Sequence, residues 1–208
     1  MNSQSWKKLF LPKKKTSLVT KISILGGKTI VRNKNRQDIK NDFSWRTDQE
    51  LSELDATLPL NLSYEQFESI SINDLSKSSP WSEKFSIDDL NNKHIGNCMF
   101  YDINRWDKSC EYGIMIGEKS YWNGGFGTDA TISLLYYIFT ETYIENIYLH
   151  TLTSNYRAQK AFKKAGFECQ KKSSKGRYEF YKMTSSKKEW IEKFENYKVK
   201  ITPVEEQD

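Results

Sequence analysis

The stretch YWNGGFGT at residues 121–128 decides the fold of this chain. Its three glycines lie within four residues, which lets the backbone turn tightly and approach a ligand closely. The pattern predicts a strand before the turn at 111–116 and a helix after it at 128–140. Backbone N–H groups then converge at the positive end of that helix. Such a turn suits a phosphate or pyrophosphate; the alternative is that the glycines serve only the geometry of a strand-to-helix connection.

Two other nucleotide-binding motifs fit this turn less well. A P-loop needs a lysine between glycine and Ser/Thr, whereas Gly127 is followed directly by Thr128. A dinucleotide-binding fingerprint starting at Gly125 meets Ala130 in its last position, which some variants permit. That fingerprint belongs at the first strand–helix turn of a parallel array, and the sequence supplies no such array.

The rest of the pattern predicts an α+β fold with a mixed sheet. A hairpin is expected at 22–32 around Gly26-Gly27, and helices are expected at 36–45 and after Ser63, which begins a capping box. The other expected strands lie at 85–87, 94–102, 146–151, 167–170 and 178–183, with a loop at 173–176. The other expected helices lie at 155–165, ended by Gly166 in a left-handed cap, and at 188–197.

Composition bounds the class of protein. The length of 208 residues suits one domain with additional peripheral segments, and a content of 37% hydrophobic residues suffices for a core. No apolar run is long enough to cross a bilayer, and no secretory signal is recognised. Three cysteines without CxxC spacing and two isolated histidines argue against a disulfide framework or a metal site. We therefore expect a cytoplasmic protein without metal.

The net charge of +5 comes from the first twenty residues, which contain five lysines and no acid. We expect a basic arm at 1–20, a domain at 21–184 and a helical extension with a tail at 185–208. The arm is either a solvated tail or a docking segment for an acidic partner such as RNA. Nucleic-acid binding is not expected of the remaining chain, which sums to zero charge.

At 121–130 the sequence resembles the acyl-CoA motif of the GNAT acetyltransferase superfamily, Gln/Arg-x-x-Gly-x-Gly/Ala. Gly125 and Gly127 match that motif, and Trp122 replaces the Gln/Arg. The Tyr-Trp pair at 121–122 resembles the residues found at this place in the branch of ribosomal-protein N-terminal (RimJ/RimL-like) acetyltransferases. The segments 95–97, 111–117, 155–158 and 162–167 also resemble that branch, so the resemblance covers roughly residues 20–184.

The resemblance implies a fold and a cofactor site. The strands at 111–116 and 146–151 should form a splayed parallel pair, with the pantetheine arm of acetyl-CoA between them. The residues implied in cofactor binding are Met115 and Ile116 through their backbone, Gly124, Gly125, Gly127 and Thr128 at the pyrophosphate, Asn155 near the thioester, and Lys164 at a phosphate. A lysine at 164 is equally compatible with a solvated helix face.

The implied chemistry is aminolysis of a thioester. The acceptor ammonium must lose a proton before it attacks, and a nearby carboxylate can take that proton. Glu111 matches the family's position for this base; the alternative is a strand carboxylate that binds substrate or pairs with a cation. The amide of Met115 or Ile116 is the candidate donor to the oxyanion.

One position departs from the family pattern. Many relatives carry a tyrosine where this chain has Phe162, and that tyrosine protonates the leaving thiolate. A thiol pKa of about 8.5 still makes the thiolate a tolerable leaving group. Because Phe162 has no hydroxyl, an alternative function stays open: a non-catalytic regulatory module that binds acyl-CoA on the same fold.

The acceptor that the resemblance implies is a primary amine, and a protein N-terminus, a polyamine, an amino sugar and an antibiotic all stay open. The candidates for acceptor binding are Trp45, Arg46, Tyr101 and Asp102, each of which could instead serve packing or the surface. The sequence is compatible with a monomer or a homodimer.

Overall fold

The structure, a computed structural model, describes residues 21–204 and is built around one mixed sheet. The strands lie in the order β7-β8-β6-β5-β4-β3-β2-β1-β9. Their bounds are β1 Lys21–Leu25, β2 Thr29–Asn33, β3 Ser82–Asp89, β4 His94–Asn104, β5 Ser109–Ile116, β6 Asn146–Leu152, β7 Glu168–Lys175, β8 Tyr178–Ser186 and β9 Lys200–Val204. The lysine-rich arm predicted at 1–20 lies outside the described residues, as do residues 205–208.

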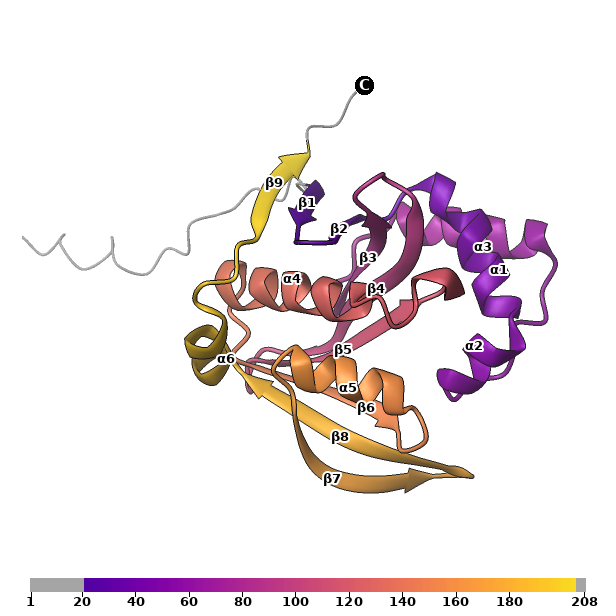
Figure 1. The fold of residues 1–208 in the computed structure, drawn as a ribbon. Helices are drawn as coiled ribbons and strands as arrows, with labels where there is room; N and C mark the ends of the chain where they lie inside the picture. Colours follow the sequence, from indigo (N-terminus) through magenta and orange to yellow (C-terminus); the bar gives the residue numbers. More distant parts are fainter. Residues whose placement is uncertain (1–20, 205–208) are drawn as a thin grey trace, which may run out of the picture.

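Helices cover one face of this sheet and one end of it. Figure 1 shows α4 and α5 lying over one face, whereas α1, α2 and α3 gather at one end. Their bounds are η1 Arg36–Asp38, α1 Ile39–Thr47, α2 Gln49–Leu54, α3 Tyr64–Leu75, η2 Lys119–Tyr121, α4 Phe126–Glu141, α5 Tyr156–Lys164 and α6 Lys187–Phe194. No helix within residues 21–204 has the length and apolar character to span a membrane.

The predicted splayed parallel pair is confirmed. β5 and β6 pair in parallel only at their first residues, and the last pair is Glu111 with Tyr148. β5 nevertheless continues to Ile116 and β6 to Leu152, so the strands separate beyond that pair (Figure 1). The other strand pairings of the described sheet are antiparallel.

The predicted apolar stripe of α4 forms the centre of the core. Ala130, Leu134 and Ile138 are fully buried, together with Leu135 and Phe139. The helix begins at Phe126, two residues before the predicted start, because Gly125 takes φ +85° and turns the chain directly into it. A buried helix across the sheet stabilises the fold by removing apolar surface from water.

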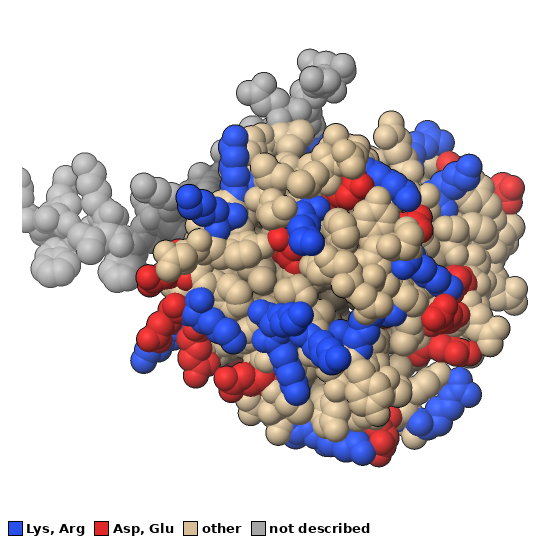
Figure 2. Space-filling view, in the orientation of Figure 1, with Lys and Arg blue, Asp and Glu red and all other residues tan. Residues whose placement is uncertain are grey.

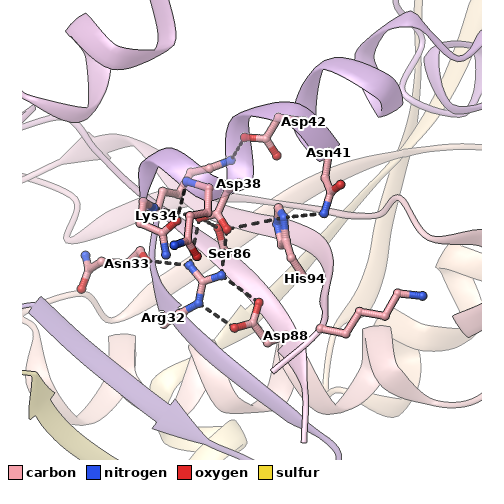
Figure 3. Close-up of polar contacts among 12 residues, drawn as sticks. Arg32, Asn33, Lys34, Asp38, Asn41, Asp42, Ser86, Asp88 and His94 are labelled. Atoms are coloured by element: carbon pink, nitrogen blue, oxygen red, sulfur yellow. Dashed lines mark hydrogen bonds and ion pairs between the residues drawn. The ribbon is translucent and has the colours of Figure 1, made fainter. Parts of the chain in front are cut away.

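A buried polar cluster holds α1 against the sheet (Figure 3). The Arg32 guanidinium lies between two carboxylates, 2.8 Å from Asp38 Oδ1 and 2.6 Å from Asp88 Oδ2. Ser86 Oγ also donates to Asp38 at 2.7 Å, and His94 Nδ1 lies 3.5 Å away from that carboxylate. Burial by itself would raise the pKa of Asp38, but the hydrogen bonds from Arg32 and its other donors hold that pKa at about 2.

Local signals in the sequence located several elements well. The hairpin around Gly26-Gly27, the capping box at Ser63 and the left-handed Gly166 at φ +97° are all confirmed. A Cβ at Gly166 would also lie 2.8 Å from the Trp190 ring, so packing requires glycine there as well.

Elements that depend on distant partners differ from the prediction. The prediction of a loop at 173–176 is wrong, because β7 runs to Lys175 and pairs with β8 up to the turn. Two further elements, α2 and β9, were not predicted. β9 pairs with β1 at the edge of the described sheet, where Pro203 is tolerated because an edge strand does not need every N–H.

Candidate active site

A cleft of about 240 Å³ lies between the separated end of β5, the glycine turn and α5. It brings together most of the residues predicted to hold the cofactor. Those lining it are Met115, Ile116, Gly125, Gly127, Thr128, Asn155 and Lys164. Gly124 lies in the same turn but does not line the cleft, and its carbonyl accepts a hydrogen bond from Lys28 Nζ at 3.0 Å.

The glycine turn is tight and close to β5. Asn123 and Gly125 both take positive φ, at 62° and 85°. A Cβ added at Gly127 would lie 3.5 Å from Ile116 Cγ1, so the turn packs directly on the strand. The N–H groups in the first turn of α4 have no partner within the helix and point out of its positive end. The arrangement suits an anion at the mouth of the turn.

Trp122 has a role that the sequence did not reveal. Its indole Nε1 donates to the carbonyl of Ile116 at 2.7 Å, and the centre of the Arg157 guanidinium lies 3.5 Å from the ring centroid. The tryptophan in place of the usual Gln/Arg therefore ties the end of β5 to α5 across the cleft. Both side chains line the cleft, and no local pattern marks such a contact.

Cations gather along α5. The helix carries Arg157, Lys160, Lys163 and Lys164, and all but Lys163 line the cleft. Figure 2 shows Lys and Arg side chains clustered over the part of this face where Figure 1 draws α5. Together with the positive end of α4, they provide a favourable environment for phosphate groups.

Glu111 lies at the vertex where β5 and β6 separate. Its Oε1 is 2.9 Å from His150 Nδ1, and its side chain is 17% exposed. Tyr101 is its cross-strand partner on β4. Burial raises the pKa of the Tyr101 hydroxyl, and the charge of Glu111 raises it further. In the sequence, His150 is only one of two isolated histidines, whereas in the structure its ring contacts the carboxylate of Glu111.

The four predicted acceptor residues fall into two groups. Tyr101 and Asp102 lie near this vertex, where the Tyr148 hydroxyl donates to Asp102. Trp45 and Arg46 lie on α1, and neither lines the cleft. Trp45 is 8% exposed and packs on Gly117, whereas Arg46 forms an ion pair with Asp55 at 3.2 Å.

Asp129 anchors the start of α4, directly after the glycine turn, and was missed by sequence reasoning. This buried carboxylate in the first turn of α4 accepts from the amides of Gly27, Lys28 and Thr29, from Thr29 Oγ1 and from the Tyr197 hydroxyl. It therefore ties α4 to the β1–β2 turn and to the segment after α6. The sequence signal was only an acid in the first turn of a helix, which is common.

The comparisons with known proteins agree with this geometry. A sequence model described as Acetyltransferase (GNAT) domain matches residues 28–168, more than half of the chain. No curated protein matches the sequence.

Solved structures share the fold at low sequence identity. The spermidine N-acetyltransferase from Vibrio cholerae, in complex with CoA and spermine, is 20% identical with a TM-score of 0.69. That match covers 78% of this chain and 98% of the Vibrio chain. A GNAT-family acetyltransferase from Bacillus anthracis is 15% identical with a TM-score of 0.68, covering 80% of this chain and 99% of the Bacillus chain.

Proposed function

The chain belongs to the GNAT acetyltransferase domain family, and from that premise we propose that it transfers the acetyl group of acetyl-CoA to a primary amine by direct attack. One observation carries the proposal: the glycine turn, the separated end of β5 and the cationic helix α5 line a single cleft. The turn and α5 suit the phosphates, and the open edge of β5 suits the pantetheine arm.

In the proposed reaction, Glu111 accepts the proton that the acceptor ammonium must lose. The free amine then forms a C–N bond to the acetyl carbonyl carbon. The oxyanion of the tetrahedral intermediate accepts a hydrogen bond from the Met115 or Ile116 amide. The C–S bond breaks as the carbonyl re-forms, and CoA leaves as a thiolate whose conjugate acid has a pKa of about 8.5. The nitrogen then gives up its second proton to that thiolate, directly or through water, which leaves a neutral amide and CoA thiol.

Two acceptor classes follow from two different observations. The Tyr121-Trp122 pair supports the branch of ribosomal-protein N-terminal acetyltransferases, and therefore a protein N-terminus. The spermidine N-acetyltransferase among the structural neighbours supports a polyamine. A screen of acceptors should contain both classes. The cysteine composition supports a reducing, cytoplasmic location.

A second candidate function rests on Phe162, which lines the cleft and has no hydroxyl to protonate the thiolate. It is a regulatory module that binds acyl-CoA without turnover. Release of CoA thiol in the presence of an amine distinguishes the two functions, because only an enzyme releases it.

Calorimetry with acetyl-CoA, CoA and desulfo-CoA tests the cofactor site. Gly125→Glu places an anion at the turn and should abolish binding in a protein that remains folded. Asn92→Glu is the matched control, because Asn92 is exposed, takes φ 63° and does not line the cleft. Failure of the wild type to bind any of the three ligands would refute the proposed function.

A further inference from the structure

Side chains occupy the outer backbone acceptors of the gap between β5 and β6. On β5, the indole Nε1 of Trp122 donates to the carbonyl of Ile116 at 2.7 Å. On β6 and just after it, Gln159 Nε2 donates to the carbonyls of Leu152 and Thr153 at 2.9 and 3.0 Å. Backbone groups at an open strand edge are normally available to an added strand. Here the carbonyls farthest from the vertex are already bonded.

The next carbonyl inward on the same edge of β5 is that of Ile114. In an extended strand, the N–H and C=O groups of every second residue point to the same edge. Because Trp122 reaches the Ile116 carbonyl from the cleft, the carbonyl of Ile114 and the N–H of Ile116 also face the cleft. An acceptor and a donor therefore lie next to each other on this edge. That donor is one of the two amides proposed for the oxyanion.

Trp122 is held in place through its ring as well as through its N–H. The guanidinium centre of Arg157 on α5 lies 3.5 Å from the ring centroid, which is contact distance for a stacked cation. Lys119 Nζ lies 5.9 Å from the same centroid, and is itself bound to Asp48 and Glu50 at 2.9 and 2.8 Å. The indole is therefore fixed in front of the last carbonyl of β5 by partners from α5 and from the start of α2.

We propose that Trp122 is a positioning residue that sets where the pantetheine arm lies along β5. Because the indole occupies the Ile116 carbonyl, an N–H of the arm pairs with the Ile114 carbonyl, which brings the thioester to the Ile116 amide. Without the indole N–H, the arm can pair with the Ile116 carbonyl instead, two residues or about 7 Å further out. This inference rests on the proposed function and assigns to the same cleft a residue that controls how the bound donor reacts.

Replacement of Trp122 separates binding from turnover. Trp122→Phe removes the N–H donor and keeps a ring for Arg157. The Kd for acetyl-CoA, from calorimetry, should equal the wild-type value, because a displaced arm still binds. The kcat should fall about fivefold or more, as expected when one hydrogen bond no longer favours one of two positions. It is measured as CoA thiol release with spermidine or an amino-terminal peptide, whichever the wild type acetylates.

Two further variants complete this measurement. Trp122→Gln restores an N–H donor without the ring, and should recover part of the kcat that Trp122→Phe loses. Trp106→Phe makes the same change at a side chain that is 95% exposed, and should leave both Kd and kcat unchanged. A kcat of Trp122→Phe equal to that of the wild type would overturn the inference. A raised Kd with unchanged kcat would also overturn it, because Trp122 would then serve binding alone.

A second measurement follows the indole directly and needs no turnover. In protein with isotope-labelled tryptophan, the indole N–H resonance of Trp122 is the one that is lost in Trp122→Gln. On addition of CoA, this N–H should exchange with solvent as slowly as in the free protein, because its bond to Ile116 persists. Faster exchange in the CoA complex would show that the indole leaves this carbonyl, and would overturn the inference.

The two measurements distinguish failure of this inference from failure of the proposed function. A wild type that binds CoA but acetylates no amine would refute the proposed function, while slow indole exchange in its CoA complex would still support the position of Trp122. Turnover in the wild type with fast indole exchange would support the proposed function and overturn the inference alone. A wild type that does not bind CoA would overturn both.

Discussion

His150 Nδ1 lies 2.9 Å from Glu111 Oε1, across the point where β5 and β6 stop pairing. Glu111 belongs to the last parallel pair, with Tyr148, and His150 follows Tyr148 by two residues on the same face of β6. The imidazole therefore spans the start of the gap and restrains the carboxylate that we propose as the base. We treat His150 as a positioning residue.

Replacement of this carboxylate tests the proposed base directly. Glu111→Gln keeps the size of the side chain but cannot accept the proton, so kcat should fall by about 10²- to 10⁴-fold. The Kd for CoA should not change, because Glu111 does not line the cofactor cleft. Equal turnover in the variant and the wild type would assign Glu111 to substrate binding or structure.

His150→Gln should lower kcat less than Glu111→Gln and leave the KM for the amine unchanged, because the carboxylate loses the partner that restrains it but can still accept the proton. A purely structural role would instead lower the free energy of unfolding and leave the kcat of the folded protein in place. Both quantities should be measured on the same preparation.

Phe162→Tyr tests whether the missing hydroxyl limits turnover. Phe162 lines the cleft and packs edge-on against Tyr112 and Phe167, so a tyrosine ring keeps these contacts. If protonation of the thiolate limits the rate, kcat should rise, by less than the ~10²-fold that a general acid usually supplies, because the thiolate already leaves readily. An unchanged kcat with unchanged stability would show that water protonates the thiolate adequately.

Replacement of Trp45 tests whether this side chain serves packing or acceptor binding. A Cβ added to Gly117 would lie 2.1 Å from the Trp45 ring, and the His94 ring centroid is 4.8 Å away. Trp45→Ala should therefore cost about 3–5 kcal/mol of unfolding free energy in denaturant titration. Trp106→Ala is the control, since that side chain is 95% exposed. A raised KM for the amine with unchanged stability would instead support Trp45 as an acceptor residue.

Asp129→Asn should be strongly destabilising. The amide of asparagine supplies one acceptor oxygen where the carboxylate supplies two, so donors of the β1–β2 turn lose their partner. Unsatisfied buried donors cost about 1–3 kcal/mol each, which predicts a loss of about 2–5 kcal/mol. Glu145→Gln, at an exposed pair with Lys108, should cost less than about 1 kcal/mol. Similar losses in both variants would contradict the assigned role of Asp129.

Acid stability should depend on Asp38. The pKa of Asp38 is lowered from 3.8 to about 2 in the folded protein. Its contribution to the free energy of unfolding is therefore fully present at a pH above its pKa in the unfolded chain, and is lost as the pH falls through its pKa in the folded protein. The shift corresponds to about 2 kcal/mol. The unfolding free energy of Asp38→Asn should therefore fall less steeply than that of the wild type between about pH 5 and pH 2. Parallel curves would exclude Asp38 as a source of acid sensitivity.

The sequence by itself determined the elements whose signals are local. The glycine turn, the stripe of Ala130, Leu134 and Ile138, and the cap at Gly166 depend on residues only a few positions apart. Backbone conformation and helical periodicity are properties of such short segments, so they can be read along the chain. The same local motifs carried the resemblance to the family, which the family match confirms.

Only the tertiary structure decided which side chains meet across the sheet. Asp129 accepts from Gly27, 102 residues earlier, and His150 reaches Glu111, 39 residues earlier. β9 exists as a strand because β1 offers it an edge, and the tip of the β7–β8 hairpin lies opposite Asp55 only because of how the chain folds. These contacts depend on strand register and on how the helices pack, which no short segment specifies, because each is stabilised by partners distant in the chain.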